Sequence, residues 1–160
     1  MTSHLRFRSG PVQLVKASVD AESVIEPGDL VYLDSGDARP ASEFTWDTNL
    51  ATTQAAFADV FLGVAHERSA DGDTAPISVD ISPHAVYEFD LDAAGYTLGD
   101  LLGPDEASSS LMTQQLEAVA TAARAIARLV ELTTGTVSKA RVTFASAFST
   151  GSANANAQIG

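Results

Sequence analysis

Residues 77–82 alternate strictly between apolar and polar side chains, and residues 85–91 resume the alternation after Pro83. Because successive side chains of a strand point to opposite faces, this pattern predicts two consecutive strands, each with one buried face. We expect acidic outer faces on both, with Asp80 on the first. Other short apolar runs between turn residues continue to residue 144, and strands at this interval are typical of a small β-barrel or β-sandwich. The sequence therefore predicts an all-β fold.

Two turns share a Gly-Asp pair. Gly28-Asp29 and Gly99-Asp100 are each followed by an apolar run. Glycine tolerates the positive φ of a tight turn, and an Asp side chain can bond the turn backbone, so each pair predicts a turn that leads into a strand. A third glycine, Gly63, lies inside the apolar run 60–65, where it predicts a bulge or a close approach of two backbones.

The segment 111–132 admits two interpretations. Its apolar residues at 116, 119, 123, 126 and 130 recur at spacings of three and four, which favours one amphipathic helix. The alternative is a pair of strands, because intrinsic propensity is a weak prior that tertiary context overrides. Residues 137–144, which follow a turn at Gly135, are interpreted as a final strand.

A chain of 160 residues can bury one core, so we expect a single domain with three parts. Residues 1–13 are predicted to form an extended arm, 14–148 a β-rich core and 149–160 a short flexible polar tail. No apolar run approaches the roughly 18 residues that span a bilayer, which argues against a membrane partner. The absence of cysteine excludes disulfides and thiolate metal sites.

Acidic residues dominate the charge. The formal net charge is −12, and residues 69–123 contain no Lys or Arg. Since nucleic-acid affinity comes from Lys and Arg that neutralise phosphates, direct nucleic-acid binding is not expected. The few cations gather toward the ends of the chain, beginning with Arg6 and Arg8.

No catalytic motif is recognisable. His66-Glu67 lacks the second His of a zinc-protease helix, and the three His residues are too scattered to nominate a metal site. The Asp-rich segments 34–37 and 71–73 are interpreted as turns rather than cation loops. Asp90 and Asp92 are interpreted as a solvated acidic face rather than an acid–base pair. We therefore predict no enzymatic activity, no cofactor and no metal.

Residues 38–57 form a connection that is long for a compact domain. It contains three aromatic residues, Phe44, Trp46 and Phe57. Aromatic side chains are common both in cores and at interfaces, so these three are equally candidates for core packing and for interface anchors.

Segments 25–31, 61–66, 77–89 and 96–100, taken in order, resemble the small decoration (cement) proteins that stud tailed-phage capsids. The resemblance implies that 115–121 and 125–131 are two strands. It also implies a protein on the outer surface of the virion that binds the major capsid protein of an expanded shell, bridges its subunits and forms homotrimers. The basic arm would then lie along the shell, with Leu5, Arg6, Phe7 and Arg8 as its capsid contacts.

A carbohydrate-binding or receptor-binding β module on a virion is the alternative function. It would need a platform of exposed aromatic side chains, for which Trp46, Tyr87 and Tyr96 are the candidates.

Overall fold

The computed structural model describes residues 5–149, and within them it places eleven β-strands and one α-helix. The all-β prediction is confirmed. The strands are β1 (Phe7–Ser9), β2 (Leu14–Val19), β3 (Leu30–Asp34), β4 (Asp37–Pro40), β5 (Phe61–Ala65), β6 (Ile77–Asp80), β7 (Val86–Gly95), β8 (Leu101–Glu106), β9 (Leu111–Ala118), β10 (Ala127–Leu129) and β11 (Thr136–Phe144). The helical elements are α1 (Leu50–Ala58) and the 3-10 turns η1 (Ala41–Glu43) and η2 (Ala122–Arg124).

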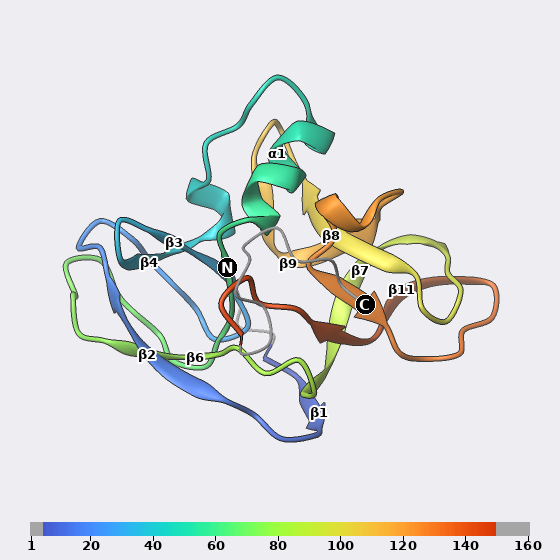
Figure 1. Ribbon diagram of the computed structural model, residues 1–160, viewed down its shortest axis with the longest axis horizontal. Helices are drawn as coiled ribbons and strands as arrows, with labels where there is room; N and C mark the ends of the chain where they lie inside the picture. Colours follow the sequence, from blue (N-terminus) through green and yellow to red (C-terminus); the bar gives the residue numbers. More distant parts are fainter. Residues whose placement is uncertain (1–4, 150–160) are drawn as a thin grey trace.

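The strands form two barrels that lie side by side, with α1 above the junction (Figure 1). Barrel 1 is the closed ring β2-β4-β3-β5-β6. Barrel 2 has the order β7-β11-β10-β8-β9 and is closed by a parallel pairing of β7 with β9, while β1 adds to its β7.

The two barrels are the same fold used twice. In each, the first strand pairs in parallel with the third, and the other four pairings are antiparallel. A single alignment of the two barrels preserves the register of all five pairings. The matched pairs are Val19–Ala38 with Leu91–Leu116, Val15–Val79 with Tyr87–Val142, Val31–Gly63 with Leu102–Ala127, Ala65–Val79 with Leu129–Val142, and Val31–Pro40 with Leu102–Ala118.

The Gly-Asp turns are equivalent points of this repeat. Gly28 has φ of 99° and Gly99 has φ of 92°, the positive values that favour glycine. Asp29 accepts a hydrogen bond from the amide of Glu26 at 2.9 Å, and Asp100 accepts one from the amide of Thr97 at 2.8 Å. Both turns lead into a strand, as predicted.

The cores of the barrels also match position by position. Ten buried residues form the core of barrel 1: Ala17, Val19, Ile25, Val31, Ala38, Leu62, Ala65, Ile77, Val79 and Ile81. Their equivalents, Phe89, Leu91, Tyr96, Leu102, Leu116, Ile126, Leu129, Ala140, Val142 and Phe144, all belong to the second buried cluster. At seven of these ten positions barrel 1 has the smaller side chain, with alanine where barrel 2 has Phe89, Leu116 and Leu129, whereas Ile77 is larger than its equivalent Ala140.

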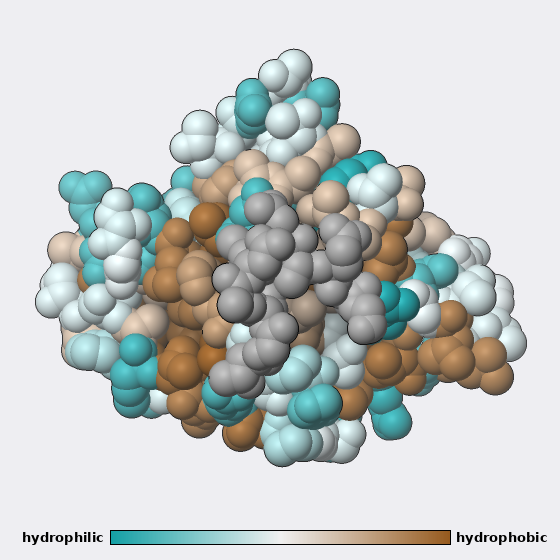
Figure 2. All heavy atoms as spheres, viewed as in Figure 1, coloured by the Kyte–Doolittle hydropathy of each residue, from teal (hydrophilic) through white to brown (hydrophobic). Residues whose placement is uncertain are grey.

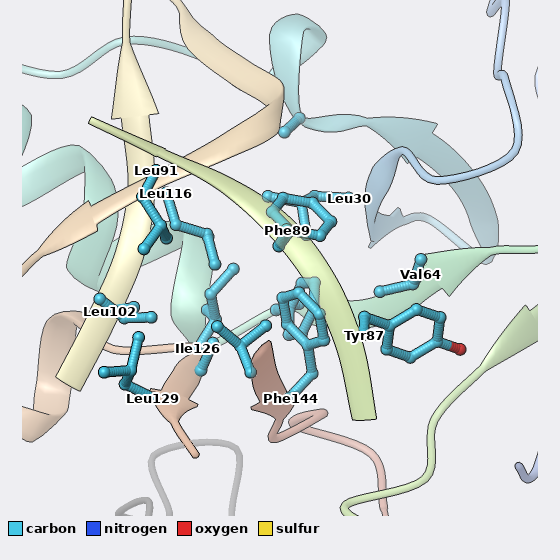
Figure 3. Packing of buried hydrophobic residues seen from close by; sticks show 14 of the residues in the cluster. Leu30, Val64, Tyr87, Phe89, Leu91, Leu102, Leu116, Ile126, Leu129 and Phe144 are labelled. Carbon is cyan, nitrogen blue, oxygen red and sulfur yellow. The ribbon is translucent and has the colours of Figure 1, made fainter. Parts of the chain in front are cut away.

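The second cluster continues across the junction. The outer faces of β3 and β5 contribute Leu30, Tyr32, Phe61 and Val64, each at most 6% exposed. Figure 3 shows Leu30 and Val64 beside Phe89 and Tyr87 of barrel 2. The outer face of β3 and β5 is thus buried against barrel 2, so the core of barrel 2 extends across the junction while barrel 1 keeps a core of its own.

The segment 111–132 is two strands, β9 and β10, joined through η2. The helical spacing was misleading because burial here follows the strands: Leu116, Ile126 and Leu129 are fully buried in barrel 2. The strand prediction for 137–144 is confirmed by β11.

Two sequence expectations were wrong. Residues 38–57 are not one long connection, because they contain most of β4, η1 and most of α1. The N-cap of α1, Asn49, accepts a hydrogen bond from the amide of Thr52. Asp80 does not lie on a solvated outer face but is 3% exposed, because it accepts hydrogen bonds at the junction of the barrels.

Candidate interaction surfaces and the barrel junction

The N-terminal segment lies on barrel 2. Strand β1 pairs with β7 beside Tyr87, on the edge that β9 occupies further along at Asp90 and Leu91. Arg6 Nη2 lies 2.6 Å from Asp90 Oδ1, and Arg8 Nη2 lies 3.3 Å from Glu88 Oε1. The predicted arm extending from the body is not confirmed: the free edge of β7 and its acidic side chains hold residues 7–9 in place. Residues 1–4 lie outside the described residues.

The apolar residues of this segment face β7 only in part. Leu5 packs against the core of barrel 2, and the ring of Phe7 meets Tyr87 edge to face at 5.8 Å while staying 40% exposed. Arg8 likewise keeps a 40% exposed side chain. Of the four predicted capsid contacts, Phe7 and Arg8 are therefore the more accessible.

The aromatic residues of the long connection belong to the core. Phe57 is fully buried, and Phe44 contacts Tyr32 and Phe57 edge to face at 5.0 and 5.4 Å. Trp46 is half-buried against the same cluster. The candidate aromatic platform for a glycan or receptor was wrong, since Tyr87 and Tyr96 are 2% and 7% exposed.

A chain of polar side chains crosses the junction. Tyr87 donates its hydroxyl proton to Asp80 Oδ2, with the oxygens 2.5 Å apart, and His66 Nε2 lies 2.6 Å from the same hydroxyl. Because the tyrosine proton is used toward Asp80, His66 must donate through Nε2. Burial raises the pKa of Tyr87 and lowers the pKa of His66, so both are neutral at neutral pH. This network joins β6 to β7, so His66 has a structural role at the barrel junction.

A second polar contact joins the Gly-Asp turn of barrel 1 to β9. Gln114 Nε2 donates to Asp29 Oδ1 at 2.6 Å, and Asp29 is 4% exposed. Burial raises the pKa of the Asp29 carboxyl. The turn borders a cavity of about 390 Å³ whose walls come from both barrels, including Val24 and Pro40 on one side and Leu111 and Met112 on the other.

Helix α1 is the third link between the barrels. Gln54 is fully buried, and its Nε2 donates to the carbonyl of Pro104 and to Glu117 Oε1, each at 2.8 Å. Its Oε1 accepts from Arg124 at 2.7 and 2.9 Å. Sequence reasoning missed this residue; the signal was Asn49, a favourable N-cap before an Ala-rich stretch.

The Asp-rich segments behave as turns. Ser35 and Gly36 have positive φ between β3 and β4, and Gly72 has φ of 85°. Within residues 5–149, no three His, Asp or Glu side chains gather where they could hold a metal ion. In the same range, no helix has the length and apolar character to cross a membrane.

Large apolar side chains are also exposed outside the N-terminal segment. On barrel 2 these are Leu98, Val130 and Leu132, which are 57%, 38% and 82% exposed. Figure 2 shows apolar residues at the right-hand end of the molecule, where the loops of barrel 2 lie in Figure 1. On the other parts of the described chain they are Val12, Leu14, Val24 and Phe148.

Comparison with known proteins gives no match. No protein-family model matches this chain, and no curated protein sequence matches it. The fold and the surfaces described above are therefore the basis for a functional assignment.

Proposed function

We propose that this protein is a non-enzymatic capsid decoration protein of a tailed bacteriophage. It binds the outer surface of an expanded capsid, bridges major capsid protein subunits and stabilises the shell. The observation that carries the proposal is where the buried polar side chains and the exposed apolar side chains lie. The buried side chains Asp29, Asp80 and Tyr87 bond across the barrel junction, and Gln54 bonds α1 to barrel 2. The surface is mostly acidic, and it also exposes large apolar side chains such as Phe7, Leu98 and Leu132. Such a surface suits binding to a protein lattice.

The segments that carry the resemblance to decoration proteins support the same assignment. They comprise the two Gly-Asp turns with the start of β3, strand β5, and the run from β6 into β7. These segments include strands of both barrels, among them β7, which follows the last strand of barrel 1 and begins barrel 2. The resemblance therefore lies in the strands and turns that determine the fold.

Binding to the shell would rest on several modest contacts per molecule. A lattice presents the same site many times, so linked contacts act as intramolecular events and raise the overall affinity by roughly two to four orders of magnitude. In this proposal the exposed sides of Phe7 and Arg8 contact capsid subunits, while Leu5 and Arg6 hold the segment on β7. A homotrimer would supply three such segments.

Co-sedimentation with purified capsids tests the proposal. The full chain is expected to pellet with expanded shells and to stay in solution with unexpanded ones. The charge reversal Arg8→Glu should weaken binding about tenfold. A cation that would pair with acidic groups of the capsid is replaced by an anion that those groups repel. The matched control is Arg68→Glu, which alters another exposed arginine with one ion pair, Arg68 Nε to Glu26 at 3.1 Å, and should bind like the wild type. Failure to pellet with expanded shells, or equal binding to both forms, would refute the proposal.

A further inference from the structure

The cavity of about 390 Å³ lies where the Gly-Asp turn of barrel 1 meets β9 of barrel 2, and we call it the junction cavity. Its size is at the lower end of the range of sites for small organic ligands. Val24 and Ala107 are exposed at its rim, so the cavity opens to solvent. Its inner walls include the buried Pro40 and Leu111 and the half-buried Met112, all of them apolar.

Hydrogen bonds between the barrels hold the walls of the junction cavity in place. Gln114 Nε2 on β9 donates to Asp29 Oδ1 at 2.6 Å, and Ser110 Oγ, just before β9, donates to the carbonyl of Ser42 at 3.1 Å. Asp29, Ser42 and Ser110 all line the cavity. The cavity is therefore formed before any ligand binds, which lowers the entropy cost of binding.

Asp29 places a carboxylate in the junction cavity without a cation beside it. Within residues 5–149 no Lys or Arg forms an ion pair with Asp29, and Arg68 pairs with Glu26 instead, Nε to Oε1 at 3.1 Å. Burial raises the pKa of Asp29, and the neighbouring Glu26 carboxylate raises it further. A buried carboxylate is costly unless a proton or a cation neutralises it, so this position suits a cation supplied from outside the chain.

Asp29 and Gln114 also leave hydrogen-bond acceptors for a ligand. Asp29 accepts from the amide of Glu26, from Gln114 and from the side chain of Thr113, which leaves about one of the roughly four acceptor sites of a carboxylate. Gln114 Oε1 is buried and accepts no hydrogen bond from the described residues. Because it belongs to the amide that contacts Asp29, one donor group can serve both acceptors. A primary ammonium has the matching charge and N–H donors.

The internal repeat shows that the turn itself does not require a buried acid. Asp100 occupies the equivalent position, bonds the amide of Thr97 as Asp29 bonds that of Glu26, and is only half-buried. The local role of the turn Asp is thus fulfilled without placing it in a cavity. A carboxylate that is buried beyond what its turn needs, and that borders a cavity, is a candidate for ligand binding.

We propose that the junction cavity binds a small alkylammonium compound. The ammonium group donates to the Asp29 carboxylate and to Gln114 Oε1. The alkyl chain packs on Pro40, Leu111 and Met112. The ligand would link the two barrels, because its charged end bonds the turn of barrel 1 while its chain packs on β9. Binding of this ligand concerns the free protein and requires no shell, so the inference goes beyond the proposed function.

An NMR titration of the free protein with hexylammonium tests the site. We expect a Kd on the order of 1 mM, with shifts at the side-chain amide of Gln114 and the methyl group of Met112. Asp29→Asn should weaken binding at least about tenfold, because the introduced amide carries no charge. The matched control Asp100→Asn removes the same charge from the equivalent turn and should bind hexylammonium like the wild type.

Two further probes separate this site from the general attraction of cations to an acidic protein. Hexanol has the alkyl chain without the charge, and methylammonium has the charge without the chain. Each should bind at least about tenfold more weakly than hexylammonium. Equal binding of methylammonium would mean that the net charge of −12 attracts any ammonium, and equal binding of hexanol would mean that the carboxylate plays no part. Either result would overturn the inference, as would binding that survives Asp29→Asn or a wild type that does not bind hexylammonium.

Discussion

Asp29 and Asp100 occupy the same position of the same turn, yet their surroundings differ. Both accept a hydrogen bond from the amide three residues earlier. Asp29 is also covered by Gln114 from the other barrel and is 4% exposed, whereas Asp100 is half-buried. The shared contact is local and follows from the sequence; the difference comes from the packing of one barrel on the other.

Burial of the Asp29 carboxylate should cost stability at neutral pH. Burial raises the pKa of Asp29 in the folded state. The stabilising contribution of the protonated Asp29 carboxyl to the free energy of unfolding is therefore fully present below the unfolded pKa and is lost as pH rises through the folded pKa. Asp29→Asn removes this titration. The contact with β9 can be kept, because the amide introduced at position 29 can donate to Gln114 Oε1 once the Gln114 amide rotates.

We therefore expect Asp29→Asn to raise the free energy of unfolding by about 1 kcal/mol at pH 7, with a gain that shrinks toward pH 4. Urea unfolding at several pH values measures it. The matched control Asp100→Asn makes the same change in the less covered turn and should stay within about 0.5 kcal/mol of the wild type. A destabilised Asp29→Asn at pH 7 would show that the charge is needed there.

Residue roles that depend on the local chain were predictable, and roles that depend on distant partners were not. The two Gly-Asp turns and the hairpin turn at 34–37 were predicted, because glycine and Asp fix turn geometry within a few residues. The pairing of Asp80 with Tyr87 was not, since Asp80 sits in an alternating run that looks half-solvated. Nothing in that pattern shows that a second barrel covers its outer side.

At the scale of elements, alternation and turn residues were enough to predict most strands. They failed where one pattern fits two structures, as in 111–132, and where a short helix has no clear apolar stripe. The buried residues of α1 are Thr53, Gln54 and Phe57, two of them polar, so hydrophobic periodicity could not reveal the helix.

Gly63 is the element-scale feature that the sequence predicted most directly. A Cβ at this position would lie 2.0 Å from the carbonyl oxygen of Asp80, so β5 and β6 approach too closely for any side chain. The register of β3 on β5 also shifts beside it, between Val31 and Tyr32. Its equivalent in barrel 2 is Ala127, whose methyl group is buried at the same position.

We expect Gly63→Ala to lower the free energy of unfolding by about 2 to 3 kcal/mol, because the backbone must move to relieve the clash. Thermal or urea unfolding measures the loss. Gly95→Ala is the matched control within a strand: its nearest atom would be 3.9 Å away, so its stability should change by less than about 0.5 kcal/mol. Equal stability of the two variants would contradict the close approach.

At the scale of the whole molecule, the sequence predicted a small β-barrel or β-sandwich but not two barrels in one chain. Segments 25–33 and 96–104 are equivalent, yet they share only Gly, Asp and Leu at consecutive positions. Ten core positions match while the residues change size, because a barrel interior needs apolar volume rather than particular side chains. Duplication is therefore visible in the register of the strands and nearly absent from the residues.

The duplicated barrel also bears on the proposed function. The two barrels pack closely and bury polar side chains such as Asp29, Asp80 and Tyr87 where they meet. This account predicts a mechanical role. The protein would strengthen a shell by linking its subunits, with many weak contacts acting together.

The most direct measurement is the temperature at which expanded capsids lose their integrity, followed with increasing amounts of the protein. The account predicts that this temperature rises with occupancy and levels off when the lattice sites are filled, since a ligand that binds only the intact shell stabilises it by mass action. Binding that saturates while the disruption temperature stays unchanged would contradict the central claim that this protein stabilises the shell.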